Sequence, residues 1–395
     1  MELRQKYRLG EVFNVLDSKR IPLSSKERES RRGNYPYYGA QGIIDYIDDY
    51  IFDGEYLLIA EDGENLKSQK QNIAQIARGK YWVNNHAHIL ESNGKCDIRY
   101  ICHLLNKMDI SGYITGSAQP KLNQANLCSI EVELPDIQEQ KRIAEFIGNF
   151  DDKIELNRQI NDNLEQQAQA LYKSWFVDFE PFKDGDFIDS EMGSIPRGWK
   201  IGKIKDIIDL LSGFPFKSSD FTKNGEYQLI TIKGVQDGYL DVTSADRLSY
   251  LPSKMPHYCI LKIGDILISL TGNVGRICIV DRKDLLLNQR VAIVSPKNKR
   301  DSFYAYTMFR NDSFKNELIH LARGTAQLNL SPVETADKLT IIPPDIILED
   351  FAKIGQDIFK QYVSTKMENI RLCEMRDSLL PKLMSGELKI NEIDR

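Results

Sequence analysis

Two carboxylates and a lysine stand close together in the segment Pro135-Asp136…Glu139-Gln140-Lys141, whose letters resemble a nuclease motif. Metal-assisted phosphodiester cleavage needs such carboxylates on adjacent strands, where they can share metal ions. In this chain Asp136 and Glu139 are three residues apart and precede a helical pattern of apolar residues. This spacing is typical of a helix start with Asp136 as its N-cap, so we expect no catalytic centre there.

Other residues that could do chemistry lack their partners. Gly272-Asn273-Val274-Gly275 has two glycines but not the remainder of a phosphate-binding loop. Pro343-Pro344-Asp345 lacks both the preceding and the aromatic residue with which amino-methyltransferases hold a flipped base. His86 and His88 would share one face of a strand, but no third ligand lies nearby, so a core or DNA-facing role is favoured over zinc. The sequence predicts no catalytic site, metal or cofactor.

Polar and basic loops offer another chemistry, the reading of nucleic acid. Base edges are read by Arg, Lys, Asn, Gln, Ser or Thr side chains, and phosphates are held by Lys and Arg. Singly, each loop fits a solvated turn as well as a DNA contact, but as a set they predict DNA binding. The candidate residues are Arg31, Arg32, Asn34, Tyr37, Tyr38, Gln41, Lys67, Gln69, Lys70, Arg78, Lys80, Asn85, His86, Gln119, Lys217, Ser218, Thr271, Asn273, Arg276, Gln289, Arg290, Arg323, Thr325 and Gln327.

The charge of the chain argues against strong DNA binding by this protein alone. Its 395 residues carry a formal net charge of −5, with −7 in residues 131–184 and +3 in residues 185–340. Affinity for phosphates follows the number of basic contacts, so we expect the chain to need basic partners. No apolar leader or membrane-spanning run is present, and the six cysteines occur singly, which predicts a cytoplasmic protein with reduced thiols.

The sequence contains an internal repeat. Gly116-Ser117-Ala118-Gln119 recurs as Gly324-Thr325-Ala326-Gln327, an offset of 208 residues, which also carries Leu134-Pro135 onto Ile342-Pro343. Periods of 20–50 residues indicate a solenoid, whereas a period near half the chain indicates a duplicated module. The molecule should therefore have pseudo-two-fold symmetry.

Each copy begins with a β-rich part. Runs of β-branched and aromatic residues between Gly and Asp turns predict strands at 43–47, 56–60, 86–90, 228–232, 265–269 and 290–294. Gly54-Glu55 aligns with Gly264-Asp265 at an offset of 210, and Asn84-Asn85-His86 aligns with Asn288-Gln289-Arg290 at 204. The two parts should share a fold and differ in their insertions.

Each copy ends in a heptad pattern that turns polar in its middle, at Asn157/Asn161 and at Thr365/Asn369. The pattern predicts two helices of about 40 residues, each about 60 Å long, packed as an antiparallel coiled coil. Two separate amphipathic helices are the alternative. In the second pattern, the apolar position after Phe351 could be occupied by either Ile354 or Gly355. The predicted interface residues are Ile143, Ile147, Phe150, Ile154, Asn157, Asn161, Leu164, Leu171, Ile358, Tyr362, Asn369, Leu372 and Leu379.

Several stretches together resemble the specificity subunits of type I restriction–modification systems, over essentially the whole chain. Tyr37-Tyr38-Gly39-Ala40-Gln41-Gly42-Ile43-Ile44-Asp45-Tyr46 and residues 52–63 look like one class of target recognition domain. Gly193-Ser194-Ile195-Pro196-Arg197-Gly198-Trp199 resembles the lead-in to a second such domain. Residues 134–143 and 376–388 resemble the repeated helical regions of the family.

The resemblance implies an α+β fold, with two similar β-rich target recognition domains separated by two long helices in an antiparallel coiled coil. The implied segments are 1–133 (recognition domain 1), 134–184 (helical region 1), 185–341 (recognition domain 2) and 342–395 (helical region 2).

The resemblance also implies a function. The chain would read a bipartite double-stranded DNA target and position two adenine-N6 methyltransferase (modification) subunits and two restriction (motor-nuclease) subunits. S-adenosylmethionine, ATP and Mg²⁺ would belong to those partners, and this chain would be non-catalytic and would not bind membranes. The rival hypothesis is a non-catalytic coiled-coil adaptor that binds protein partners only and shows no DNA sequence preference.

Overall fold

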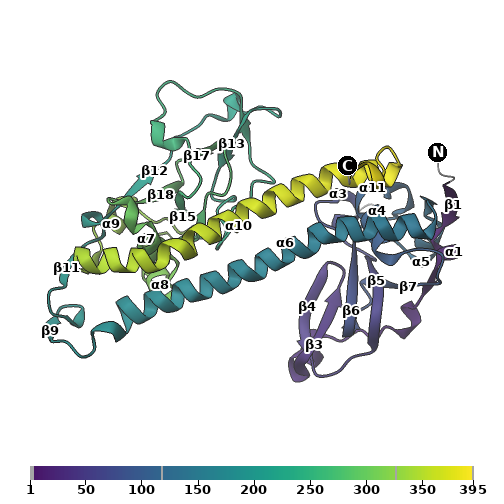
Figure 1. Cartoon of the computed structure of the whole chain (residues 1–395), viewed down its shortest axis with the longest axis horizontal. Coiled ribbons are helices and arrows are strands. Elements are labelled where there is room, and N and C mark those ends of the chain that lie inside the picture. The colour runs from purple at the N-terminus through teal and green to yellow at the C-terminus, as the bar shows by residue number, and fades with distance from the viewer. Residues whose placement is uncertain (1–3, 117–118, 325–326, 394–395) are drawn as a thin grey trace. The chain divides into compact units, whose positions relative to one another are not determined.

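The computed structural model describes residues 4–116, 119–324 and 327–393. The chain divides into two compact units: unit 1 comprises residues 1–154 and 372–395, and unit 2 comprises residues 155–371. Each unit combines a β-rich part with portions of two long helices, α6 (Ile137–Tyr172) and α10 (Asp345–Ser385) (Figure 1). The predicted α+β architecture with two long helices is confirmed. Within the described ranges, every helix is too short or too polar to span a bilayer.

The β-rich part of unit 1 is a six-stranded sheet in the order β2-β7-β5-β6-β3-β4, beside a separate β1–β8 ribbon. Within this sheet, Gly54 of β5 lies opposite Gly79 of β6. Their φ angles of 148° and 74° allow the β5–β6 pair to bend at this point. The strands are β1 (Gln5–Arg8), β2 (Phe13–Val15), β3 (Arg32–Gly39), β4 (Gly42–Ile47), β5 (Phe52–Ala60), β6 (Ala74–Val83), β7 (Ala87–Ser92) and β8 (Glu131–Leu134). The helices are α1 (Leu9–Val12), α2 (Ser25–Ser30), α3 (Asn65–Ser68), α4 (Ile98–Lys107), α5 (Gln124–Ser129) and the C-terminal α11 (Ile390–Ile393).

Unit 2 repeats this plan with longer loops. Its β-rich part contains the sheets β12-β18-β15-β16 and β14-β13-β17, and a β11–β19 ribbon corresponds to β1–β8. The strands are β9 (Phe187–Ser190), β10 (Gly193–Pro196), β11 (Lys200–Lys203), β12 (Ile208–Ser212), β13 (Tyr227–Ile230), β14 (Arg247–Leu248), β15 (Ile266–Ser269), β16 (Ile277–Ile279), β17 (Leu285–Leu287), β18 (Val291–Pro296) and β19 (Leu339–Ile342). The helices are α7 (Ser302–Arg310), α8 (Asp312–Leu321) and α9 (Pro332–Ala336).

Strand pairing aligns the two units. Leu57 of β5 lies opposite Leu90 of β7, and Ile266 of β15 lies opposite Val294 of β18. The N–H of Leu122 donates to Glu61 and that of Leu330 donates to Leu270, which aligns Glu61 with Leu270. The offset is therefore 209 in the first strand of each pair and 204 in the second. The predicted offset of 204 is confirmed, whereas 210 is wrong by one residue. Gly54 lies inside β5 while Gly264 lies in the turn before β15, so the two Gly-acid pairs are not equivalent.

Both units complete their cores with residues from α6 and α10. In unit 1, Ile147 of α6 and Leu383 of α10 are at most 1% exposed and belong to the same apolar cluster as the strand residue Leu57. In unit 2, Leu164 and Phe351 belong likewise to one cluster with strand residues. Burial of these side chains is the main stabilising term. In unit 1 two separate segments of the chain supply it, whereas unit 2 is continuous over residues 155–371.

The two long helices run antiparallel. In unit 1 an Arg376 Nη atom lies 2.6 Å from Oδ1 of Asp151, and in unit 2 Nδ2 of Asn157 donates to Oδ1 of Asn369 at 2.9 Å. Later residues of α6 thus meet earlier residues of α10. Asn157 is fully buried, and within the described residues its Oδ1 and that of Asn161 have no hydrogen-bond partner. Such a layer costs stability and favours one register, because a shift would bury these amides against apolar side chains.

The predicted coiled-coil interface residues are all buried or half-buried. Their faces are shared with a short helix of each β-rich part, α4 in unit 1 and α7 in unit 2. Tyr306 of α7, for example, donates to Oε2 of Glu165 on α6 at 2.5 Å. Of the two alternatives in the second pattern, Ile354 is 49% exposed and Gly355 packs against Phe303. The helices therefore serve as local core and as coiled coil together.

Substitution of Gly355 tests the close packing of α10 against α7. A Cβ atom there would lie 1.8 Å from Cδ1 of Phe303, so Gly355→Ala should lower the free energy of unfolding by about 1–3 kcal/mol through overpacking. The matched control is Gly148→Ala in α6, where no atom lies within 4 Å, and a gain of about 1 kcal/mol from helix propensity is expected. Urea unfolding of both variants measures the difference. Stabilisation by both substitutions would contradict the packing.

Candidate nucleic-acid interface

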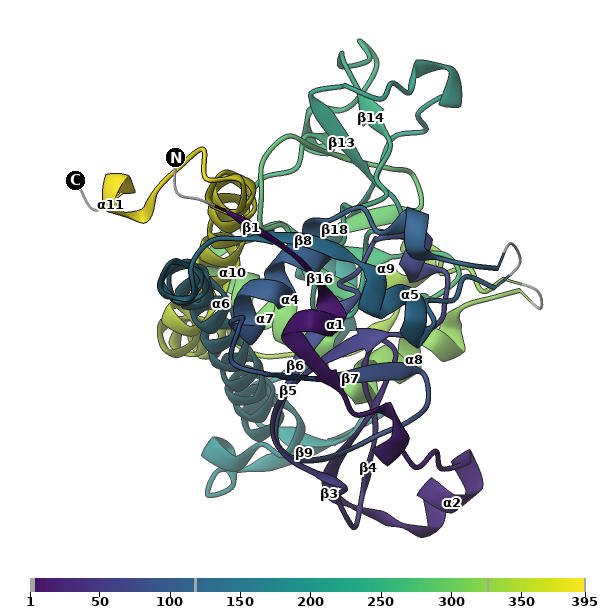
Figure 2. The same ribbon diagram turned by 90° about the vertical axis from the view of Figure 1, so that its right-hand side faces the viewer.

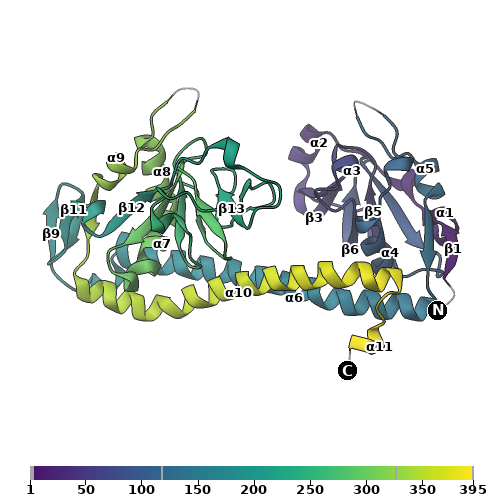
Figure 3. The ribbon, with the colours of Figure 1, turned by 90° about the horizontal axis from the view of Figure 1, so that it is seen from above.

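A short hairpin in each unit contains the repeated Gly-Gln motif. In unit 1, Thr115 and Lys121 exchange two backbone hydrogen bonds of 2.8 Å. In unit 2, Arg323 and Asn329 exchange the equivalent bonds, at 3.0 and 2.7 Å. The offset of 208 read from the sequence is therefore the structural correspondence here. Figures 2 and 3 show each hairpin projecting from its own unit on the side away from the long helices.

A glycine is required at the same place in both hairpins. Gly116 and Gly324 have φ angles of 82° and 118°, and a Cβ atom would lie 2.2 Å from the Gln119 carbonyl oxygen or 2.3 Å from that of Gln327. This close approach explains why the motif recurs. Of the candidate residues, Gln119 and Gln327 are exposed, whereas Thr325 lies outside the described residues.

Backbone hydrogen bonds tie each hairpin to the ends of the central strands. The N–H of Leu122 donates to the Glu61 carbonyl (2.8 Å), and the Glu61 N–H donates to the His86 carbonyl (2.9 Å). In unit 2, Leu330 donates to Leu270 (2.7 Å), and Leu270 donates to Arg290 (3.0 Å). We call this arrangement the loop frame; it consists of residues 61–63, 84–86, 115–116 and 119–122 in unit 1, and 270–272, 288–290, 323–324 and 327–330 in unit 2.

Three basic side chains on or beside the loop frame of unit 1 have polar partners within the unit. Nδ1 of the exposed His86 lies 2.7 Å from Oδ2 of Asp62. Nζ of Lys121 lies 3.2 Å from Oε1 of Glu61, and Nζ of Lys67 donates to the Gly116 carbonyl at 3.1 Å. The β3–β4 turn that carries Gln41 adjoins this frame, because the N–H of Asn84 donates to the Tyr38 carbonyl at 3.0 Å.

A buried ionic network lies beneath the frame of unit 1. Nη1 of Arg20 lies 2.7 Å from Oε2 of Glu61, and Nη2 of Arg20 lies 3.3 Å from Oδ2 of Asp17. Nδ1 of His88 lies 2.5 Å from Oδ2 of Asp17, and its Nε2 lies 2.7 Å from the Leu122 carbonyl oxygen. Burial raises the pKa of Asp17, but the hydrogen bond and charge of His88, with the charge of Arg20, outweigh it, so the pKa lies below its ordinary value.

The network does not fit a metal site, although oxygen and nitrogen atoms of Asp17, Glu61 and His88 lie within 4.8 Å of one another. Both partners of His88 are acceptors, so both ring nitrogens must donate and neither keeps a lone pair for a cation. Arg20 already forms an ion pair with each of the two carboxylates, and Lys121 forms a second one with Glu61. The expectation that His86 and His88 share one face is wrong, because His86 precedes β7 and is half-exposed while His88 is buried in the network.

Unit 2 has an open groove at the corresponding place. It has a volume of about 620 Å³, and Thr271, Gln289, Arg290, Gln327 and Asn329 are among its lining residues. Four of these five were candidates from the sequence. The hydroxyl of Thr271 is buried and donates to Oδ1 of Asn329 at 2.9 Å, so Thr271 positions Asn329 instead of facing a ligand itself.

Smaller side chains account for the groove. Cross-strand pairing places Ser212 opposite Ala292, where unit 1 has Asp17 beside His88. Ser212 lines the groove, whereas in unit 1 the equivalent volume holds two ionic side chains. The sequence analysis missed Ser212, Asn329 and the equivalent Asp17 and Lys121. The offset of 208 applied to Lys121 would have found Asn329, but no local signal marks Ser212.

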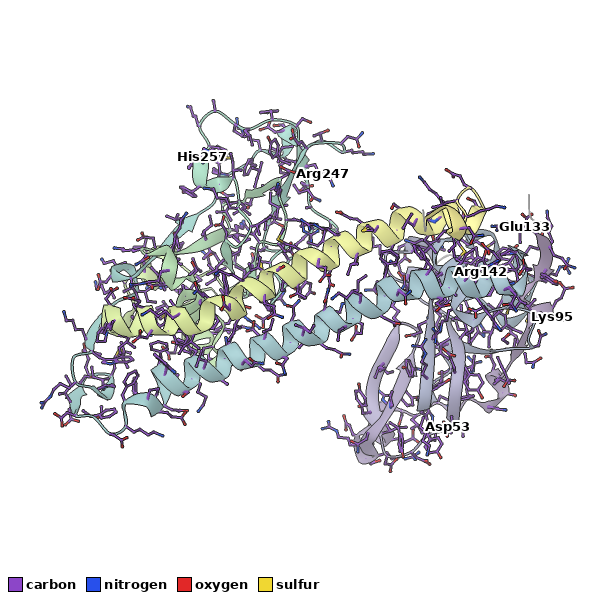
Figure 4. The ribbon with its side chains drawn as sticks, in the orientation of Figure 1. Asp53, Lys95, Glu133, Arg142, Arg247 and His257 are labelled. Carbon is purple, nitrogen blue, oxygen red and sulfur yellow. The ribbon has the colours of Figure 1, made fainter. Side chains whose placement is uncertain are left out.

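The other candidate residues lie elsewhere, and one prediction is wrong. Tyr37 is 0% exposed and its hydroxyl accepts from the Leu23 N–H (2.9 Å), so it belongs to the core. The half-buried Tyr38 packs against Tyr81. Lys80 lies opposite Asp53, which Figure 4 shows at the end of the sheet remote from α6.

The remaining candidates fall into two groups. Four have polar side-chain partners: Arg31 with Asp48, Arg78 with Glu55, Arg276 with Gln236 and Arg323 with Glu334. A fifth, Gln69, donates to the Met108 carbonyl. The other exposed candidates are Arg32, Asn34, Lys70, Asn85, Lys217, Ser218 and Asn273. For all of these residues, contact with DNA stays a prediction.

Comparisons with known proteins agree on one family. The model of the Type I restriction modification DNA specificity domain matches residues 1–166 and again residues 196–369. The type I restriction enzyme MjaIX specificity subunit of Methanocaldococcus jannaschii is 27% identical over 394 residues, covering 94% of this chain and 90% of the relative. The putative specificity subunit S.HindORF215P of Haemophilus influenzae is 30% identical over 273 residues, covering 69% and 67%. The crystal structure of a type I restriction–modification S subunit from M. genitalium shares the fold, with a TM-score of 0.59 at 15% identity and coverage of 97% and 96%.

The ionic network of unit 1 predicts a pH dependence of stability. The pKa of Asp17 is lowered by folding, so its ionised form contributes stability above its ordinary pKa of about 4, and this contribution is lost as the pH falls through the lowered value. Asp17→Asn should therefore reduce the free energy of unfolding at pH 7 by about 3 kcal/mol and weaken the loss of stability below about pH 4. The control is Asp62→Asn, which removes a carboxylate that is more exposed than Asp17 and pairs with the exposed His86. This substitution should reduce the free energy of unfolding by less than about 1 kcal/mol. Denaturant unfolding of both variants at pH 7 and below about pH 4 measures these effects. If the two variants lost the same free energy of unfolding at pH 7, the stabilising role of Asp17 would be contradicted.

Proposed function

Because this chain belongs to the Type I restriction modification DNA specificity family, we propose that it is the DNA-recognition subunit of a type I restriction–modification complex. It reads a bipartite double-stranded target, and each unit contacts one half through its loop frame. One observation carries the proposal: the two units share a backbone frame but present different side chains on it. Asp62, His86 and Lys121 in unit 1 stand where Thr271, Arg290 and Asn329 stand in unit 2. Different side chains on one frame suit two different half-sites.

The chain also acts as a scaffold in this proposal. The hairpins project on the side of each unit away from the long helices, which leaves the outer faces of α6 and α10 for protein partners (Figures 2 and 3). Residues 131–184 carry a net charge of −7, which suits basic protein surfaces and not DNA. The proposed partners are two adenine-N6 methyltransferase subunits and two motor-nuclease subunits. S-adenosylmethionine, ATP and Mg²⁺ belong to those subunits, and this cytoplasmic chain is non-catalytic.

The long helices set the separation of the two half-sites in this proposal. Each of them passes from one unit into the other without interruption, α6 between Ile154 and Glu155 and α10 between Arg371 and Leu372. A helix rises about 1.5 Å per residue, so the number of residues between the units becomes a length along the duplex.

Mapping of N6-methyladenine across the host genome, with and without this gene, tests the proposal. We expect a gapped two-part motif that is methylated in the parent strain and unmethylated after deletion, with restoration by the plasmid-borne gene. Replacement of residues 1–133 by another recognition domain of the family should change one half of the motif only. Methylation that does not depend on the gene, together with duplex binding that shows no sequence preference, would favour the protein-only adaptor.

Matched insertions test the role of the helices. Seven residues inserted at Ile154/Glu155 and seven at Arg371/Leu372 keep the antiparallel register and add about 10 Å of helix. At about 3.4 Å per base pair, the gap in the methylated motif should grow by about three base pairs. A heptad inserted in α6 alone breaks the register and serves as the control, for which we expect loss of stability in thermal unfolding. An unchanged gap with the matched insertions would contradict the role.

A further inference from the structure

The groove of unit 2 contains an arginine whose charge is not used within the chain. Within the described ranges, the guanidinium of Arg290 has no hydrogen bond or ion pair; the same holds only for Arg32 and Arg371, which do not line the groove. In unit 1 the equivalent His86 is paired with Asp62. An unpaired guanidinium beside a groove retains its full hydrogen-bonding capacity for a second molecule.

The lining of the groove selects for acceptor groups. It contains Arg290, the amides Gln289, Gln327 and Asn329, hydroxyl groups and apolar residues, but no carboxylate. The Thr271 hydroxyl donates a hydrogen bond to Oδ1 of Asn329, and the Nδ2 group of Asn329 stays available as a donor. Gln327 is close to the same site, because its Nε2 lies 3.4 Å from the place of a Cβ atom on Gly272. A single cation among neutral donors suits a group rich in acceptors and low in charge.

The hydrogen-bonding groups of base pairs indicate which base the groove could bind. In the major groove guanine presents two acceptors, N7 and O6, side by side, whereas adenine presents one acceptor and one donor. The two parallel N–H groups of a guanidinium match the guanine edge, and a phosphate site would more commonly gather several basic side chains. The volume of about 620 Å³ exceeds that of one side chain and leaves room for a base edge.

We propose that Arg290 reads a guanine in the half-site bound by unit 2, with two hydrogen bonds to N7 and O6. Asn329, held by Thr271, and Gln327 contact the neighbouring base pair. This inference rests on the proposed function and deepens it, because it assigns one base to one residue. The counterpart in unit 1 cannot read guanine in this way, since the imidazole of His86 has no two-pronged donor and its Nδ1 is already bound by Asp62.

The test uses the chain co-expressed with its methyltransferase subunits in a host without adenine methylation, followed by mapping of N6-methyladenine. Arg290→Ala should remove the preference for guanine at one position of one half-site, by roughly 5- to 150-fold, and leave the other half-site unchanged. Arg290→Lys keeps the charge without the fork and should also lose much of that preference. The control Lys283→Ala removes one exposed charge from the β16–β17 loop, which does not line the groove, and should leave the motif unchanged.

A binding measurement separates base reading from general affinity. The preference of each purified complex for the wild-type duplex over a duplex with A·T in place of the assigned G·C is measured by competition. A preference that falls in Arg290→Ala supports the inference even where methylation is weak throughout. A preference that is the same in wild type and Arg290→Ala overturns it, as does full rescue by Arg290→Lys, which would indicate a phosphate contact. A wild-type complex with no gapped motif at all would instead overturn the proposed function.

Discussion

The antiparallel packing of α6 against α10 is the constraint on which both units depend. Ile147 and Leu383 close the core of unit 1, and Leu164 and Phe351 close that of unit 2. Each core thus requires the beginning of one long helix and the end of the other. The buried amide of Asn157 stabilises one pairing, because its contacts to Glu368 and Asn369 would be lost in another register. Errors in the pairing of the helices would therefore disturb the packing of the β-rich parts as well.

In the loop frames, the backbone that forms the candidate interface is the same in both units, whereas the side chains on it differ. Backbone hydrogen bonds and the left-handed glycines Gly116 and Gly324 are common to both units. Side chains at the same positions differ in charge, size and pairing: Asp17 and His88 fill a volume that Ser212 and Ala292 leave open. A change of side chain on such a frame alters the surface and keeps the backbone hydrogen bonds, whose loss would leave buried polar groups unpaired. This arrangement accounts for how one duplicated module can present two different surfaces.

Much of the fold could be predicted from the sequence because its signals are periodic. The offset of 208 and the heptad patterns extend over many residues, so single ambiguities such as Ile354 or Gly355 did not change the prediction. The site was less predictable, because a loop residue shows its polarity but not its direction. Tyr37 occurs in a polar, Gly-rich stretch yet is buried, and His88 looks like a surface residue yet is held by Asp17, which is 71 residues away in sequence. The groove arises from two small residues in adjacent strands, and no local pattern distinguishes a small residue that lines a groove from one that fills a core.

The discontinuity of unit 1 has a consequence for its synthesis. The ribosome makes residues 1–154 first, but the core that contains Ile143 and Ile147 also needs Leu380, Leu383 and Met384. Unit 2, which is continuous over residues 155–371, is complete in the nascent chain before those residues emerge. The first unit to be translated is thus the last to finish folding, and its apolar helix surface stays uncovered throughout translation of the second. A nascent-chain binding factor would have its main target in the N-terminal half of α6.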